Sequence, residues 1–330
     1  MKKITLLSAA VLLFASACQK EKPLTTLPVI GNQETETPSL GERRCASYEV
    51  LQEQIANNPA LARRMEEIER FTQSYIDNKA NQRLLADGTI EIPVVVNVLY
   101  KTTAQNISQA QIQSQIDRLN LDFKALNTDY NNTPSIFQGV RSGNMGITFV
   151  LNSVIRKSTT KTSWSTNDAV KKTSQGGLNP TNPTTMLNMW VCNLSNGILG
   201  YAQFPGGSSA TDGVVIDDNA FGTTGTVTAP YNLGRTATHE VGHWLNLRHI
   251  WGDATCGSDL VSDTPNHNTA NYGCPTYPHL STCTGTPVEM TMNYMDYTDD
   301  ACMYMFTAGQ KARAAAVFVT GGPRNSFAQL

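Results

Sequence analysis

The chain has 330 residues, of which 40% are hydrophobic and 16% are charged. This length and composition allow one large domain or two small ones with a buried core, and they exclude wholesale disorder. The formal net charge is -2 and no basic stripe is visible, so neither nucleic acid nor an acidic surface is indicated as a partner.

The N-terminus has the layout of a bacterial export signal. A positive start at residues 1–3 precedes a short apolar run at residues 4–15, and small residues then lead to Cys18. We expect residues 1–17 to be a signal peptide and Cys18 to be lipidated, which predicts a secreted protein or an outer-membrane or cell-surface lipoprotein. The alternative is an ordinary signal peptide whose cleavage site lies near a cysteine. No later segment has the long apolar run that a membrane helix needs.

A polar stretch and a helical stretch follow the signal. Residues 19–44 are rich in Thr, Pro, Glu and Lys, a composition that suits a flexible tether. The helical stretch after it is expected to break at Asn57-Asn58-Pro59. The β-branched run at residues 90–100 predicts a buried strand, and we place the start of the main domain just before it.

The rest of the chain predicts an α/β domain over a mostly parallel sheet. Ser108 to Leu126 is an amphipathic helix, in which Ser108 and Gln111 match a capping box. Strand-like runs follow at residues 146–155, 186–192, 198–204 and 213–216. After residue 250 the chain is rich in turns until a predicted helix at about residues 309–319.

Most of the candidate metal-binding and catalytic residues lie in residues 239–249, whose sequence is HEVGHWLNLRH. On a helix, His239 and His243 project from one face and can reach one metal ion. His249 supplies a third ligand if the helix stops after Leu245 and the chain reverses at Asn246, a residue type that tolerates the left-handed conformation. Three histidines are the ligands of a catalytic zinc that keeps one position open.

Glu240, beside His239, is placed to act as a general base. It can take a proton from a zinc-bound water as that water attacks a peptide carbonyl, and then pass the proton to the leaving amine. HExxH also occurs by chance in helices, but here three of only five histidines fall within eleven residues at ligand spacing. A structural zinc is disfavoured because structural sites close the fourth position, usually with cysteine.

Further motifs make the resemblance to a known family specific. The run HEVGHWLNLRHIWGD, then Asp263-Thr264-Pro265, then NYMDY at residues 293–297 and Cys302-Met303 are similar to the pappalysin family of metzincin zinc peptidases, its bacterial members above all. The resemblance covers about residues 85–310. It implies a metzincin-like catalytic domain with a twisted, mostly parallel sheet and an active-site helix above an irregular, disulfide-linked lower subdomain.

The resemblance also implies roles for residues around the zinc motif. Met295 would form the Met-turn beneath the histidines, and Tyr297 would point its hydroxyl at the oxyanion; a core methionine and a core tyrosine are the alternatives. Asp253 would support His249. Asp300 would floor the pocket for the residue after the scissile bond and favour Arg or Lys there, the alternative being a solvated surface pair with Asp299.

The remaining cysteines divide into two groups. In relatives, a cysteine placed like Cys45 ligates the zinc and keeps the enzyme latent; the alternative is a disulfide between Cys45 and Cys192. Four cysteines after residue 255 allow three pairings from sequence alone. The resemblance implies the pairs Cys256 with Cys283 and Cys274 with Cys302.

Residues 259–264 resemble a calcium loop of the relatives. Oxygen ligands from Asp259, Asp263, Thr264 and the Val261 carbonyl would suit calcium. A turn held by aspartate side chains alone is the alternative.

The sequence thus predicts a secreted zinc endopeptidase made as a proenzyme, acting on proteins or peptides. We expect a tether and inhibitory pro-segment at residues 18–82, removed near Arg83, and a catalytic domain at residues 83–330. Two other functions stay open, namely a catalytically silent zinc-binding surface protein and a zinc amidase acting on cell-wall peptides. The natural substrate and the oligomeric state are not predicted.

Overall fold

The computed structural model describes residues 42–78 and 89–329. The predicted signal peptide, Cys18 and the expected activation site near Arg83 lie outside the described residues. Among the helices that the structure does describe, none is both long and apolar enough to cross a bilayer.

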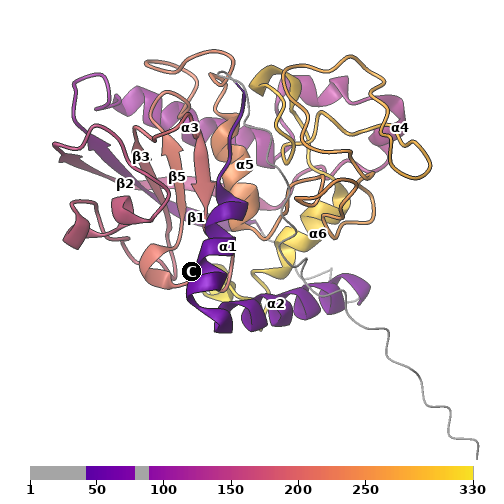
Figure 1. The fold of residues 1–330 in the computed structure, drawn as a ribbon, viewed down its shortest axis with the longest axis horizontal. Helices are drawn as coiled ribbons and strands as arrows, with labels where there is room; N and C mark the ends of the chain where they lie inside the picture. Colours follow the sequence, from indigo (N-terminus) through magenta and orange to yellow (C-terminus); the bar gives the residue numbers. More distant parts are fainter. Residues whose placement is uncertain (1–41, 79–88, 330) are drawn as a thin grey trace, which may run out of the picture. The chain divides into compact units, whose positions relative to one another are not determined.

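A five-stranded sheet forms the centre of the fold, with the strand order β2-β1-β3-β5-β4 (Figure 1). Four strands are parallel, and β4 runs antiparallel to β5 at one edge. The predicted mixed α/β class with a mostly parallel sheet is therefore confirmed. The strands are β1 (Ile90–Tyr100), β2 (Ile147–Ser158), β3 (Leu187–Cys192), β4 (Gly200–Ala202) and β5 (Val214–Asp217).

Helices α3 (Gln109–Phe123) and α5 (Arg235–Trp244) cover one face of the sheet. The apolar stripe of α3 packs on alternate residues of β1 and its neighbours in one continuous core. The other face is covered by Ala46, Val50 and the loop at residues 164–170, against Trp190 and Val215. Burial on both faces explains why the parallel strands read as unbroken apolar runs.

The capping box predicted at the start of α3 is only half formed. The Ser108 hydroxyl accepts the Gln111 N–H at 3.1 Å, but the Gln111 side chain turns away and donates to the carbonyl of Phe221 at 3.0 Å. The second half of that prediction is wrong, because a distant loop competes for the glutamine. A complete capping box lies instead at Thr307 and Gln310, where α6 (Ala308–Ala316) begins.

Two helices precede the sheet, α1 (Ser47–Asn57) and α2 (Pro59–Asp77), with the predicted break at Asn58. Helix α2 packs against α6 (Figure 1). The buried guanidinium of Arg313 on α6 forms a two-pronged ion pair with Glu69 and donates to the Asn246 carbonyl at 2.8 Å. The N-terminal helices are therefore anchored to the turn that follows α5.

The segment after α5 has little regular structure, and two disulfides cross-link it. They join Cys256 to Cys283 and Cys274 to Cys302, the pairing that the family resemblance implied. Cys45 and Cys192 are both buried free thiols, so the alternative disulfide between them is not formed. The short helices elsewhere are η2 (Thr128–Asn132), α4 (Ser135–Gln138), η3 (Ala169–Lys171), η4 (Thr173–Gln175), η5 (Ser209–Thr211), η6 (Asp300–Cys302) and η7 (Asn325–Gln329).

Candidate active site and metal centre

Helix α5 and the turn after it bring three histidines together. The helix ends at Trp244, and Asn246 takes a φ of 71°, the left-handed conformation expected where the chain reverses. That reversal returns His249 to the face that carries His239 and His243. Gly242 allows Met295 to approach from below, since a Cβ there would lie only 2.4 Å from the Met295 Sδ.

Four potential metal donors converge at this point. The ligand atoms of Cys45, His239, His243 and His249 all lie within 4.8 Å of one another, and all four residues are buried. The His243 Nε2 lies 3.1 Å from the Nε2 atoms of both His239 and His249. Lone pairs this close repel unless a cation lies between them.

The outer nitrogens of the three rings fix how the rings are oriented. The Nδ1 of His239 lies 2.6 Å from the Tyr294 carbonyl, and that of His243 lies 2.8 Å from the Leu247 carbonyl. The Nδ1 of His249 lies 2.5 Å from the Asp253 carboxylate. Each Nδ1 is thus placed to hold a proton, which leaves its Nε2 lone pair facing the shared point, as in a metal site with supporting acceptors.

Burial makes two of these rings suitable ligands. It lowers the pKa of His239 and of His243 well below the ordinary value, so both imidazoles are neutral. At His249 burial also lowers the pKa, but the Asp253 carboxylate prevails and the net shift is upward. Three histidine nitrogens and one cysteine sulfur form a donor set that zinc accepts in tetrahedral sites.

Glu240 is buried beside the histidines and is engaged by the N-terminal segment. Its Oε2 accepts a hydrogen bond from the Ser47 hydroxyl at 2.7 Å and lies 3.3 Å from the Cys45 sulfur. Burial raises the pKa of Glu240 to about 7. The Ser47 hydroxyl also accepts the Ala202 N–H at 2.7 Å, so one side chain links the glutamate to strand β4. Sequence reasoning missed Ser47, whose only signal is its place two residues after Cys45.

Residues 44–46 pair with the edge of the sheet as an added strand. Leu199 N–H donates to the Arg44 carbonyl at 2.9 Å, and Ala46 N–H donates to the Gly200 carbonyl at 3.0 Å. The bridge between Cys45 and Gly200 is parallel. A side chain at Gly200 is excluded, because its Cβ would lie 2.8 Å from the Glu240 Cγ. The chain's own N-terminal segment therefore occupies the sheet edge beside the metal donors.

The Arg43 side chain is buried and reaches Asp300. Its guanidinium donates to the Asp300 Oδ1 at 2.5 Å, to the Thr236 hydroxyl at 3.1 Å and to the Thr298 carbonyl at 3.1 Å. Asp300 is fully buried, so its alternative interpretation as part of a solvated surface pair is wrong.

The second oxygen of Asp300 supports the start of α5. The Asp300 Oδ2 accepts the backbone N–H groups of Leu233 at 2.8 Å and Arg235 at 3.2 Å. One carboxylate therefore binds the arginine and caps the helix that carries the histidines. Sequence reasoning did not identify Arg43 as the partner of Asp300, because 257 positions separate them.

Tyr297 lies against the histidines, and Met295 lies against Gly242 of the helix that carries two of them. The Tyr297 hydroxyl donates to the Cys45 carbonyl at 3.0 Å, and its ring contacts that of His249 at a centroid distance of 4.9 Å. Burial raises the pKa of Tyr297 well above its ordinary value, so the hydroxyl remains a donor. The phenol is thus aimed at a carbonyl of the segment that pairs with the edge of the sheet.

The predicted calcium loop is brought together only in part. The Thr264 hydroxyl lies 2.8 Å from the Asp259 Oδ1 and 3.0 Å from the Val261 carbonyl. The Asp263 carboxylate turns to α6 instead, where it accepts from the Thr307 hydroxyl and the Gly309 N–H. Burial raises the pKa of Asp259 to about 7.

Comparisons with known proteins agree with this geometry. Residues 179–319 match the peptidase M43 family model, described as pregnancy-associated plasma protein-A. An extracellular metalloprotease of Pyricularia oryzae is 34% identical over 249 residues, which cover 72% of this chain and 79% of that protein.

Two solved structures from Tannerella forsythia are also similar. Mature mirolysin in complex with a cleaved peptide is 48% identical, with a TM-score of 0.71 over 74% of this chain and 97% of that one. A promirolysin mutant is 43% identical, with a TM-score of 0.79 over 87% of this chain and 97% of that one. The chain belongs to the peptidase M43, or pappalysin, family and is a metalloendopeptidase that acts on proteins or peptides.

Proposed function

We propose that this chain is a secreted zinc endopeptidase, made as a latent proenzyme, that cleaves proteins before Arg or Lys. One observation carries the proposal. The N-terminal segment places a thiol among three histidines and an arginine in an acidic pocket, with a backbone carbonyl between them in reach of Tyr297. A segment of this kind resembles a substrate held without being cut.

The proposed chemistry divides among six side chains and the metal. His239, His243 and His249 would hold zinc, which would supply polarisation of the scissile carbonyl and activation of water. Glu240 takes the proton from the attacking water and passes it to the leaving amine. The Tyr297 hydroxyl donates a hydrogen bond to the developing oxyanion. Met295, which lies against Gly242, would form the Met-turn beneath the rings.

Latency in this proposal comes from three contacts of the segment at residues 18–82. The Cys45 sulfur takes the fourth position at the metal, the Ser47 hydroxyl engages Glu240, and the Arg43 side chain fills the pocket. The ion pair between Glu69 and Arg313 holds the same segment at a second place. Cleavage near Arg83, followed by release of the segment, frees the catalytic domain that we assign to residues 83–330.

The basic preference is supported by the way in which Arg43 is bound. A carboxylate and two neutral acceptors surround its guanidinium, and the Tyr231 ring lies 4.9 Å from its Cζ atom. A substrate arginine can use the same groups, because the charge and geometry of the guanidinium are met by fixed acceptors.

Export is supported by the sequence of residues 1–17 and by the relatives that are named extracellular metalloproteases. We propose a lipid anchor at Cys18 as the only membrane attachment. We also propose that calcium binds at Asp259, Val261 and Thr264, with Asp263 contributing through its backbone or after rearrangement. Burial of Asp259 supports a cation there.

The test is hydrolysis of an unfolded protein by the matured enzyme, beside Glu240→Ala and a chelator. We expect cleavage to be lost in both and to return when zinc is added to the chelated wild type, while Glu240→Ala keeps its zinc by elemental analysis. Cleavage by Glu240→Ala at the wild-type rate would refute the role of Glu240. Cleavage of cell-wall peptides but not of proteins would favour the amidase instead.

A further inference from the structure

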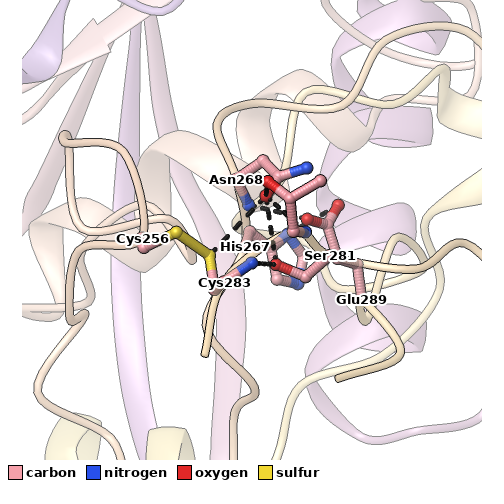
Figure 2. Close-up of a disulfide and its surroundings, with 7 residues drawn as sticks. Cys256, His267, Asn268, Ser281, Cys283 and Glu289 are labelled. Atoms are coloured by element: carbon pink, nitrogen blue, oxygen red, sulfur yellow. Dashed lines mark hydrogen bonds and ion pairs between the residues drawn. A yellow bond between two sulfur atoms is a disulfide. The ribbon is translucent and has the colours of Figure 1, made fainter. Parts of the chain in front are cut away.

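A buried polar cluster lies behind the turn that carries Met295 and Tyr297. It consists of His267, Asn271, Glu289 and Asp296, whose exposed fractions are 0%, 7%, 1% and 0%. Figure 2 shows His267 and Glu289 in the surroundings of the disulfide between Cys256 and Cys283. Burying such groups is costly unless each is hydrogen-bonded, so the arrangement of the bonds is informative.

The hydrogen bonds around His267 fix which nitrogen carries the proton in the neutral ring. Its Nε2 accepts the Met290 backbone N–H at 2.9 Å, so the hydrogen is on Nδ1. The Asn271 amide uses its two hydrogens for the Glu289 Oε2 at 2.8 Å and the Asp296 Oδ2 at 3.0 Å. The His267 Nδ1 lies within ion-pair distance of the Asp296 Oδ2, 3.3 Å away, and 3.3 Å from the Asn271 amide nitrogen.

Asp296 connects His267 to the backbone of Tyr297. Its other oxygen, Oδ1, accepts the backbone N–H of Tyr297 at 2.9 Å and that of Asn271 at 2.8 Å. One oxygen of the Asp296 carboxylate thus contacts the His267 ring and the Asn271 amide. The other oxygen binds the backbone N–H of Tyr297. A shift of Asp296 would move the phenol along with that peptide.

His267 itself is fixed to the disulfide-linked segment. Its carbonyl accepts the Cys256 N–H at 3.1 Å. The next residue, Asn268, donates its N–H to Glu289 at 2.6 Å and accepts from the Ser281 hydroxyl and the Thr282 N–H (Figure 2). The His267 ring therefore belongs to a segment whose position is fixed by hydrogen bonds and by the disulfide. Precise placement of catalytic side chains requires such rigid neighbouring structure.

We propose that His267 is a positioning residue, which through Asp296 holds the Tyr297 hydroxyl where the oxyanion forms. This inference rests on the proposed role of Tyr297 in catalysis. A hydroxyl displaced by about 1 Å loses much of its effect on the transition state, so kcat should suffer more than KM.

Two substitutions of His267 test the contacts of its two ring nitrogens separately. His267→Asn places an amide N–H near the former Nδ1 and keeps the bond to Asp296. His267→Gln places an amide oxygen near the former Nε2 and keeps the bond to Met290. Each is matured and assayed on one peptide substrate, alone and combined with Tyr297→Phe, with melting temperature and zinc content measured for every variant.

We expect His267→Gln to lower kcat about tenfold and His267→Asn less than about threefold, at similar losses of melting temperature. Tyr297→Phe should lower kcat about a hundredfold, and adding His267→Gln to it should lower kcat less than about twofold further. If the two effects multiply instead, or the two histidine variants behave alike, the inference is overturned while Tyr297 keeps its role.

If Tyr297→Phe leaves kcat unchanged, the proposed catalytic role of Tyr297 itself is refuted, and the positioning role with it. Should the His267 variants not fold, Asp296→Asn replaces them in the same cycle. That variant keeps an acceptor for the Tyr297 N–H but presents an amide to His267. It is expected to lower kcat about tenfold with Tyr297 present and less than about twofold without it.

Discussion

Replacing Ser47 by alanine tests how the N-terminal segment restrains the general base. The Ser47 hydroxyl is fully buried and makes two bonds of 2.7 Å, donating to Glu240 and accepting from Ala202. Ser47→Ala removes both bonds and leaves the Cys45 sulfur in place. The expected result is a proenzyme with higher residual peptidase activity before any cleavage of the chain.

The expected increase in residual activity follows from the loss of these two hydrogen bonds. A hydrogen bond to a charged group contributes about 1.5–3 kcal/mol, and the buried Ala202 N–H left without a partner costs about 1–3 kcal/mol. A combined loss of about 3 kcal/mol in docking free energy corresponds to about a hundredfold more proenzyme with an open cleft. Residual activity of the uncut chain should rise by about the same factor.

The assay is the initial rate on a fluorogenic peptide, with gels showing that the proenzyme stays uncut during the measurement. The control is Ser74→Ala, an exposed serine on α2, which should leave the residual activity unchanged. After maturation the Ser47→Ala and wild-type enzymes should be equal. Residual activity within twofold of wild type would refute the argument that Ser47 restrains Glu240.

Two further predictions concern pH, calcium and the second anchor of the segment. Burial raises the pKa of Asp259 from 3.8 to about 7, so the folded chain binds a proton at this carboxylate more tightly than the unfolded chain does. Ionising Asp259 therefore lowers the free energy of unfolding. This loss of stability is absent below about pH 4 and fully present above about pH 7. Calcium should therefore raise the melting temperature more at pH 8, by about 5 °C, than at pH 5, and Asp259→Asn should abolish this difference between the two pH values. A wild-type response to calcium at pH 8 in Asp259→Asn would contradict the site. Glu69→Gln weakens the ion pair with Arg313, so the residual activity of the uncut proenzyme should rise measurably, by up to about tenfold. An unchanged value would show that this contact does not hold the segment.

The sequence predicted those features that depend on local spacing. Strand β1 begins and ends at the predicted residues, because its β-branched run is bounded by a turn signal. Helix α5 and the reversal at Asn246 follow from the interval between His243 and His249 and from the conformational tolerance of asparagine. Strand β4 is shorter than predicted, because only three residues of the run pair with β5.

Long-range contacts could not be predicted in this way. Arg43 meets Asp300 across 257 positions, and Ser47 meets Glu240 across 193, with no periodicity to relate them. Gln111 matched a capping box locally, yet the loop at Phe221 and Thr226 offered its side chain other partners. Such contacts depend on how the finished elements pack, whereas local patterns record only what each element favours alone.

The most direct test of the account is the identity of the bonds that the matured enzyme cuts. We would map cleavage sites in a peptide library by mass spectrometry for the wild type and for Asp300→Asn. The asparagine keeps an acceptor for the N–H groups of Leu233 and Arg235 but removes the charge. The account predicts that the wild type cuts before Arg and Lys and that Asp300→Asn loses this preference; the same preference in both enzymes would contradict it.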